Sequence, residues 1–158
     1  GDELEFIGAL SVEGDTAQDT CSETFDDFPA ADFSNSPMFE VPEADLSLSI
    51  SGYSATIYAL AVSGTFAADG SYFGGGELSG ELDARQLVDI VGGLMDGVES
   101  ADDVCGLVAG FGVSCSACTS DGEAYCVNLE VNRLVANETG ETLVPVTAED
   151  IAANADCE

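Results

Sequence analysis

Six cysteines constrain the fold of this chain more than any other feature: Cys21, Cys105, Cys115, Cys118, Cys126 and Cys157. A structural zinc site needs four ligands, usually Cys with His, and the chain contains no His. A redox-active CxxC needs a positive environment that lowers the thiol pKa, whereas Cys115 and Cys118 precede a Ser-Asp-Gly turn in an acidic chain. The cysteines therefore predict three disulfides and an oxidising compartment.

Two ways of pairing these cysteines fit the sequence. A turn signal at 121–122 folds the chain so that the cysteines on either side of it face each other across a short hairpin. The resulting pairs are Cys118–Cys126, Cys105–Cys115 and Cys21–Cys157. The crossed alternative is Cys105–Cys118 with Cys115–Cys126. In the chain-entropy model, a Cys21–Cys157 bond contributes about 4 to 5 kcal/mol because it closes most of the chain.

The acidic charge limits what the chain can bind. It has 31 Asp and Glu residues against two cations, Arg85 and Arg133, and its net charge is −29. Such a surface repels nucleic acid, anionic lipid and phosphorylated ligands, so we expect no nucleic-acid partner. Because 46% of the residues are hydrophobic, the chain can still bury a core. Self-repulsion predicts a salty or calcium-bearing setting, where ions screen or bind the carboxylates.

The composition also removes most catalytic machinery. Without His there is no Ser-His or Cys-His nucleophile, and without Lys there is no Schiff base. The chain has no Trp, a residue expected in the sugar platforms of a glycosidase. We therefore expect a protein that is not an enzyme and needs no cofactor, with Ca²⁺ as the one ion worth testing. No run of 18 apolar residues is present, so we expect no transmembrane segment.

Hydrophobic periodicity predicts one domain over residues 1–158. Alternation in LEFIGALSV indicates a half-buried strand whose apolar face is Leu4, Phe6, Leu10 and Val12. Residues 14–44 follow as a long irregular excursion studded with Phe. The strongest β signal covers 44–66, with a bend or bulge at Gly52, and the hairpin signal at 69–70 starts a return strand.

A helical insertion is expected over residues 83–112. Asp83 begins its first helix as an N-cap with Gln86 as capping-box partner, and Ser100 begins the second with Asp103. A strand over 125–136 and a short strand over 142–146 should form a final hairpin, followed by a short helix that ends near Cys157. The predicted fold class is α+β: a mostly antiparallel, curled sheet, sandwich- or barrel-like, with an inserted helical pair and three disulfides.

Residues 64–131 carry one resemblance. GTFAADGSYFGGGELSGELDARQL and the later block ADDVCGLVAGFGVSCSACTSDGEAYCVNLEV resemble uncharacterised cysteine-containing secreted proteins and lipoproteins of myxobacteria and their relatives. In those proteins a glycine-rich hairpin precedes an LDAR-type helix start, and a C…GV.C..C.DG..YC block follows. The resemblance implies a secreted or cell-surface location and no particular activity. Position 1 is Gly1 and not a lipid-carrying Cys, so the resemblance does not extend to a lipid anchor.

Two acidic stretches are candidate calcium sites, although neither matches the EF-hand loop. Their candidate ligands are Asp26, Asp27, Asp32, Asp96, Glu99 and Asp102. The competing interpretation is a solvated loop for the first stretch and helix capping for the second. Asn137 begins an Asn-Glu-Thr glycosylation sequon on a predicted turn.

We expect a non-enzymatic secreted structural subunit of an extracellular or cell-envelope assembly, such as a fibre, sheath or surface layer. Its partners would be copies of itself or other envelope proteins. The N-terminal strand could pair with a neighbour's sheet edge, so the predicted assembly contact is Leu4, Phe6, Leu10 and Val12. Pairing of this strand within its own chain is the competing expectation. The alternative function is a calcium- or small-ligand-binding extracellular module.

Overall fold

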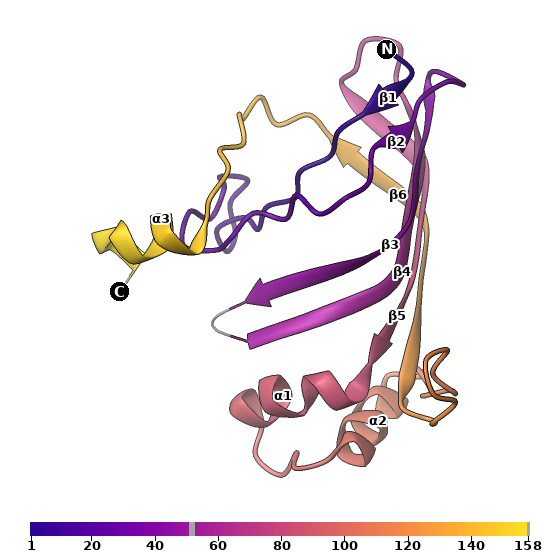
Figure 1. Cartoon of the computed structure of the whole chain (residues 1–158), viewed down its shortest axis with the longest axis vertical. Helices are drawn as coiled ribbons and strands as arrows, with labels where there is room; N and C mark the ends of the chain where they lie inside the picture. The colour runs from indigo at the N-terminus through magenta and orange to yellow at the C-terminus, as the bar shows by residue number, and fades with distance from the viewer. Residues whose placement is uncertain (51–52, 158) are drawn as a thin grey trace.

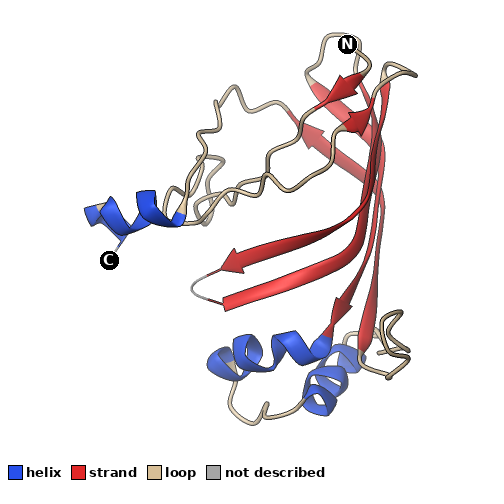
Figure 2. Ribbon diagram, viewed as in Figure 1, coloured by secondary structure: helices blue, strands red, loops and turns tan. Residues whose placement is uncertain are grey.

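The protein is built on one six-stranded antiparallel sheet in which every strand pairs with its neighbour in sequence (Figures 1 and 2). The computed structural model describes residues 1–50 and 53–157, and Ile50 by its backbone alone. The strands are β1 (Glu3–Leu4), β2 (Ala31–Asp32), β3 (Met38–Ile50), β4 (Tyr53–Phe66), β5 (Tyr72–Asp83) and β6 (Cys126–Asn137). The predicted α+β class with a mostly antiparallel sheet is confirmed. The sheet curls but stays open, so it is not a barrel.

The N-terminal strand expected over 4–12 is much shorter in the structure. Only Glu3–Leu4 forms β1, and the chain beyond it makes isolated bridges at Gly8 with Phe25 and at Ser11 with Gln18. A Cβ at Gly8 would lie 2.5 Å from the Phe25 ring, so this crossing needs glycine. Residues 5–30 therefore form an irregular arm, and the long excursion ends earlier than expected because β3 begins at Met38.

A bulge in β4 bends the hairpin of β3 and β4. Ala59 has a left-handed φ of 47°, and its N–H donates to Asp45 Oδ1 at 3.0 Å. The register of β4 shifts here against both β3 and β5, which increases local bending and twist. In Figure 1 the two strands turn away from the rest of the sheet. The bend expected at Gly52 lies outside the described residues.

Helices close the lower end of the sheet, as expected for 83–112 (Figure 2). They are η1 (Ala84–Leu87), α1 (Val88–Leu94) and α2 (Ala101–Gly110). The predicted Ser100–Asp103 cap is present, since Ser100 Oγ donates to Asp103 Oδ2 at 2.6 Å and accepts from the Asp103 N–H. Gln86 does not complete a capping box. Its side chain instead bonds the backbone of Thr56 in β4, and so ties η1 to the sheet.

The C-terminal segment packs on the N-terminal arm without forming the strand expected over 142–146. Val144 N–H donates to Gln18 Oε1 at 2.9 Å, and Gln18 Nε2 donates to Val144 O at 2.7 Å. A side-chain amide thus takes the place of a backbone partner. The expected final helix is α3 (Ala148–Ala153), capped by Thr147 and Asp150, and η2 (Ala155–Cys157) follows it.

An aromatic cluster forms the core at the upper end of the sheet. Phe39 is 2% exposed and its ring lies 5.0 to 5.3 Å from the rings of Phe6, Phe66 and Phe73. A Cβ at Gly64, the cross-strand partner of Phe39, would lie 2.8 Å from the Phe39 ring. The arm therefore packs onto the sheet through aromatic rings.

The three disulfides are Cys21–Cys157, Cys105–Cys115 and Cys118–Cys126. The first pairing predicted from the sequence is confirmed, and the crossed alternative is wrong. Three disulfides indicate an oxidising environment. Within residues 1–50 and 53–157, no helix has the length and apolar character needed to cross a membrane.

Candidate functional site

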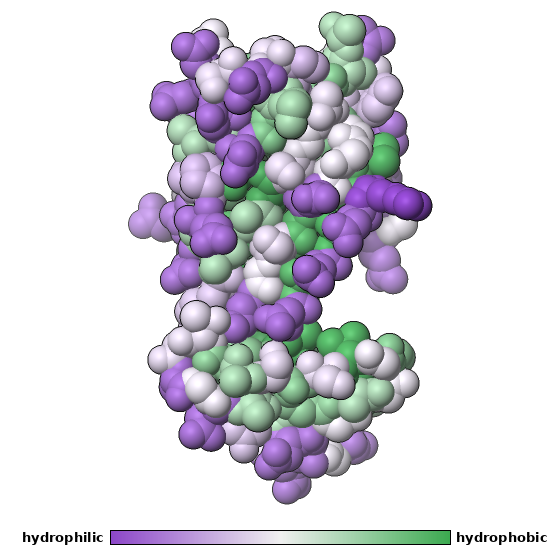
Figure 3. Space-filling view, turned by 90° about the vertical axis from the view of Figure 1, so that its right-hand side faces the viewer, coloured by the Kyte–Doolittle hydropathy of each residue, from purple (hydrophilic) through white to green (hydrophobic). Residues whose placement is uncertain are grey.

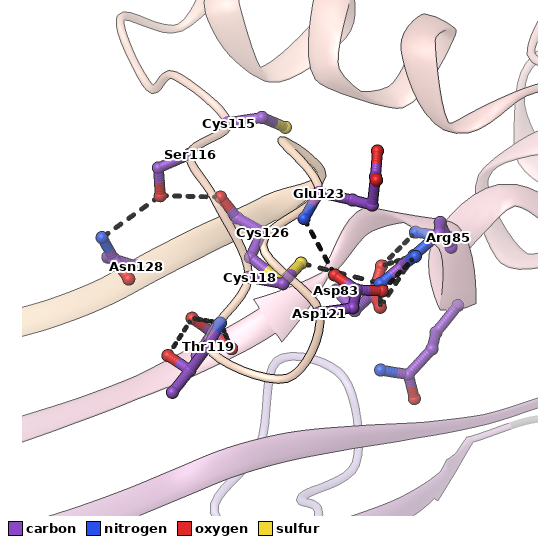
Figure 4. Close-up of a disulfide and its surroundings, with 12 residues drawn as sticks. Asp83, Arg85, Cys115, Ser116, Cys118, Thr119, Asp121, Glu123, Cys126 and Asn128 are labelled. Atoms are coloured by element: carbon purple, nitrogen blue, oxygen red, sulfur yellow. Dashed lines mark hydrogen bonds and ion pairs between the residues drawn. A yellow bond between two sulfur atoms is a disulfide. The ribbon is translucent and has the colours of Figure 1, made fainter.

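Cys126, the first residue of β6, has a neighbouring segment on each side: β5 on one and the loop that contains Ser116 on the other. On one side Cys126 lies opposite Asp83, the last residue of β5, and Ala84 N–H donates to Tyr125 O at 2.8 Å. On the other side Cys126 exchanges two backbone hydrogen bonds with Ser116, at 2.7 and 3.0 Å, and Ser116 Oγ also donates to Cys126 O at 3.2 Å (Figure 4). The N–H and C=O of Cys126 therefore point away from β5.

An arginine cluster fastens the loop that carries Ser116. Arg85 Nε and Nη2 donate to the carboxylate of Asp83, which is 9% exposed, and Arg85 Nη1 donates to Asp121 Oδ2 at 2.7 Å (Figure 4). The guanidinium also lies 5.6 Å from the centre of the Tyr125 ring. These hydrogen bonds hold the pKa of Asp83 and of Asp121 below their ordinary values, and they raise the pKa of Arg85. One cation thus joins the end of β5 to the loop before β6.

The same cluster contains the one group of three possible metal ligands found within the described residues. Asp83, Cys118 and Cys126 place possible ligand atoms within 4.8 Å of one another. Both sulfurs are joined in a disulfide, so neither is a thiolate ligand. Arg85 Nη2 lies 3.7 Å from Cys118 Sγ and compensates the buried carboxylate beside it. The cluster is a structural brace that positions the start of β6.

Beyond this brace, β6 has an open edge. In an antiparallel strand, backbone groups point alternately toward one neighbour and toward the other. Because Cys126 points away from β5, the N–H and C=O groups of Asn128, Glu130 and Asn132 do so too. No backbone hydrogen bond to another described segment satisfies them. Leu129 and Val131, between them, direct their backbone groups to β5.

The side chains along this edge differ between its two faces. Asn128, Glu130 and Asn132 lie on the outer face, while Val131, paired with Leu78, is 43% exposed on the face that carries the core. Arg133 is the extra residue of a bulge and has a left-handed φ of 62°. No ion pair to Arg133 is present in the described part of the chain. The edge thus combines open backbone groups, a half-exposed valine and a cation.

A row of oxygen-bearing side chains crosses the outer face of the sheet and ends at this edge. Its members are direct register partners from β2 to β6: Asp32, Glu40, Ser63, Glu77 and Asn132. The row lines a shallow groove of about 770 Å³. Figure 3 shows hydrophilic residues spread over the upper part of the molecule. Hydrophobic residues gather in the hollow just above the lower end, where α1 and α2 lie. No three carboxylates of the row lie close enough to share an ion in the described chain.

The four residues of the predicted assembly contact, Leu4, Phe6, Leu10 and Val12, lie in different surroundings in the structure. Leu4 and Phe6 lie against the core formed by Phe39 and its neighbours, and β1 pairs with β2 of the same chain. These two side chains are therefore occupied inside the protein. Leu10 is half-buried, and Val12 is 47% exposed on a turn of the arm.

The candidate calcium ligands do not converge in the described residues. Asp26 and Asp27 are exposed on the arm, while Asp32 lies in β2 and accepts the Ser34 N–H at 2.8 Å. Hydrogen bonding from the Ser34 side chain, and then from its N–H, lowers the pKa of Asp32. The second set, Asp96, Glu99 and Asp102, borders the α2 N-terminus, where Asp103 serves as a cap. Asn137 is exposed at the end of β6, a position that an attached glycan could occupy.

The open edge of β6 was not identified from the sequence as a contact. One signal was available. Residues 126–137 read as a strand without Lys or Pro, and these are two of the residues that commonly protect an edge strand from pairing. The absence of Lys and Pro matters only in a strand at the edge of a sheet. The sequence alone does not show which strands lie at the edges, so the interpretation depends on the strand order of the structure.

Comparisons with protein-family models, with curated proteins and with solved structures give no match for this chain. The site is therefore interpreted from its own geometry.

Proposed function

We propose that this protein is a non-enzymatic secreted structural subunit that joins an extracellular or cell-envelope assembly through the open edge of β6. The observation that carries the proposal is the run of open backbone groups at Asn128, Glu130 and Asn132, which bond no other described segment. Edge strands of this kind pair with a strand of another chain unless something covers them. The three disulfides support an extracellular setting.

The construction of the fold suits a subunit that must keep its shape while bound. Cys21–Cys157 closes a loop of sequence separation 136, and Gln18 holds the C-terminal segment on the arm. At the other end, Arg85 and two short-range disulfides fix the start of β6. The edge is therefore presented by a rigid element, which lowers the entropic cost of pairing.

A calcium- or small-ligand-binding module is the second candidate. It is favoured by the outer-face row, in which Asp32 and Glu40 are direct cross-strand neighbours of like charge, an arrangement that is unfavourable without a cation nearby. A bridging cation would also reduce the repulsion between subunits of net charge −29.

The size of the intact protein in solution tests the proposal. We expect sedimentation velocity to show a monomer in dilute buffer and larger species in about 0.15 M or more NaCl, where the screening length falls to about 8 Å. A CaCl₂ solution of equal ionic strength separates screening from ion binding. A strict monomer in all three solutions contradicts the structural-subunit proposal. A melting temperature raised by Ca²⁺ beyond its ionic strength would then favour the binding module.

A further inference from the structure

We propose that the occupant of the open edge is a second copy of this chain, and that the two β6 strands pair antiparallel about a twofold axis at Val131. This inference rests on the proposed function and names its partner and register. Pairing would join two six-stranded sheets into one continuous sheet.

The directions of the backbone groups select the register. Only residues that point away from β5 can form hydrogen-bonded pairs across the new interface, and these are Asn128, Glu130 and Asn132. An axis at Val131 places Glu130 opposite Asn132 of the other copy, and each such pair exchanges both of its backbone hydrogen bonds. An axis at Glu130 would instead bring two glutamates face to face, which is unfavourable.

The side chains agree with the same axis. Val131 of one copy then lies opposite Val131 of the other in a non-hydrogen-bonded pair, where Cα atoms are about 4.5 Å apart and side chains touch. Both valines are 43% exposed in the single chain, so pairing buries apolar surface. The new contact also lies on the face of the sheet that carries the core.

The charge of β6 favours a second copy over an unrelated acidic partner. The chain has two cations, and Arg85 is already bound by Asp83 and Asp121. The other cation, Arg133, lies in β6, where residues 126–137 contain one Glu and one Arg and so carry no net charge in a chain of net charge −29. Two copies that pair along β6 therefore gain no net like-charge repulsion from the paired strands themselves.

Matched lysine substitutions at two exposed valines test the edge. Val131→Lys puts a charge at the centre of the interface, whereas Val144→Lys makes the same change at a residue outside the sheet that is 58% exposed. Both reduce the net negative charge equally, so general repulsion weakens equally. We expect Val131→Lys to lower the association constant in brine by at least about tenfold, and Val144→Lys to change it by less than about twofold.

Cysteine cross-linking tests the register. Under mild oxidation, Val131→Cys should form an intermolecular disulfide between the substituted positions of the two copies, because their expected Cα separation falls within the disulfide range of about 4.4 to 6.8 Å. Val144→Cys should not. Peptide mapping of unreduced protein identifies the bond and shows that the three native disulfides are intact.

The outcomes separate the inference from the proposed function. Loss of association in Val131→Lys together with the Val131→Cys cross-link supports both. Association that survives Val131→Lys, or that gives no cross-link at Val131→Cys, overturns the paired β6 edge but leaves a structural subunit with another contact. A wild-type protein that is monomeric in brine overturns both.

Discussion

The two edges of the sheet are built in opposite ways. At one edge β1 and β2 have two residues each, and the N-terminal arm packs beside them on the Phe39 cluster. At the other edge β6 has twelve residues, and in the described chain Ser116 pairs with the backbone of its first residue and accepts a hydrogen bond from the Asn128 side chain. Short strands and covering segments are common means of preventing unwanted pairing. The β1 edge has short strands and a covering segment. Most of the β6 edge has neither of these protections.

This difference indicates which edge is available to a partner. A sheet with two open edges can pair with other chains at both of them. In addition, chains of net charge −29 repel one another at long range. An open edge on a strongly acidic subunit pairs only where salt or cations reduce the repulsion. The contrast between the edges is thus the structural basis of the conditional assembly that we propose.

The largest expected effect comes from releasing the arm that lies beside the short edge. Replacing Cys21 and Cys157 by Ala opens a loop of sequence separation 136, whereas replacing Cys105 and Cys115 opens one of 10. In the chain-entropy model the losses in free energy of unfolding are about 5 and about 3 kcal/mol. Denaturant unfolding without reductant measures both.

The same pair of variants sharpens the comparison between the edges. The released arm should expose β1 and β2 to solvent and leave the β6 edge unchanged, so the Cys21/Cys157 variant should still associate in brine at temperatures where it is folded. Equal destabilisation by the two variants would contradict the role given to the long-range bond. Loss of association on release of the arm would move the contact to the arm.

A smaller effect is expected at the brace before β6. Asp83→Asn keeps the shape of the side chain but removes the charge that binds Arg85, which should cost about 2 kcal/mol at neutral pH. Asp89→Asn makes the same change on the exposed face of α1 and should stay within about 0.5 kcal/mol of the wild type.

The pH dependence of this effect has a defined sign. The folded protein holds the pKa of Asp83 below its ordinary value of 3.8 because Arg85 donates to the carboxylate. The unfolded chain therefore binds the proton more readily, and the contribution of Asp83 is complete above about pH 4 and lost as the pH falls through the folded pKa. Urea unfolding of wild type and Asp83→Asn should give curves that converge below about pH 4. A difference that stays constant down to about pH 2 would contradict the charged pair.

Local signals in the sequence predicted much of this structure. The Ser100 and Thr147 caps, and the turn at 69–70, depend on residues within one turn of each other. The favoured cysteine pairing followed from a similarly local turn signal and is confirmed. In each case the residues that contact each other lie close together in the chain, so the local sequence pattern predicts the contact.

The predictions that failed depend on distant partners. The alternation in LEFIGALSV indicated a strand, but the crossing of Gly8 over Phe25 and the rings around Phe39 convert this segment into an arm. In place of the strand expected over 142–146, the segment bonds the arm, where Gln18 and Val144 are 126 residues apart in the chain. The open edge of β6 is equally non-local, since it follows from the order of all six strands.

Amide hydrogen exchange along β6 tests the central claim most directly. In dilute buffer, where we expect a monomer, the N–H groups of Glu130 and Asn132 should exchange rapidly, while those of Leu129 and Val131, which face β5, should be protected. In concentrated protein in brine, Glu130 and Asn132 should become protected as well. If these two amides still exchange rapidly under conditions where the protein has associated, the β6 edge is not the contact surface.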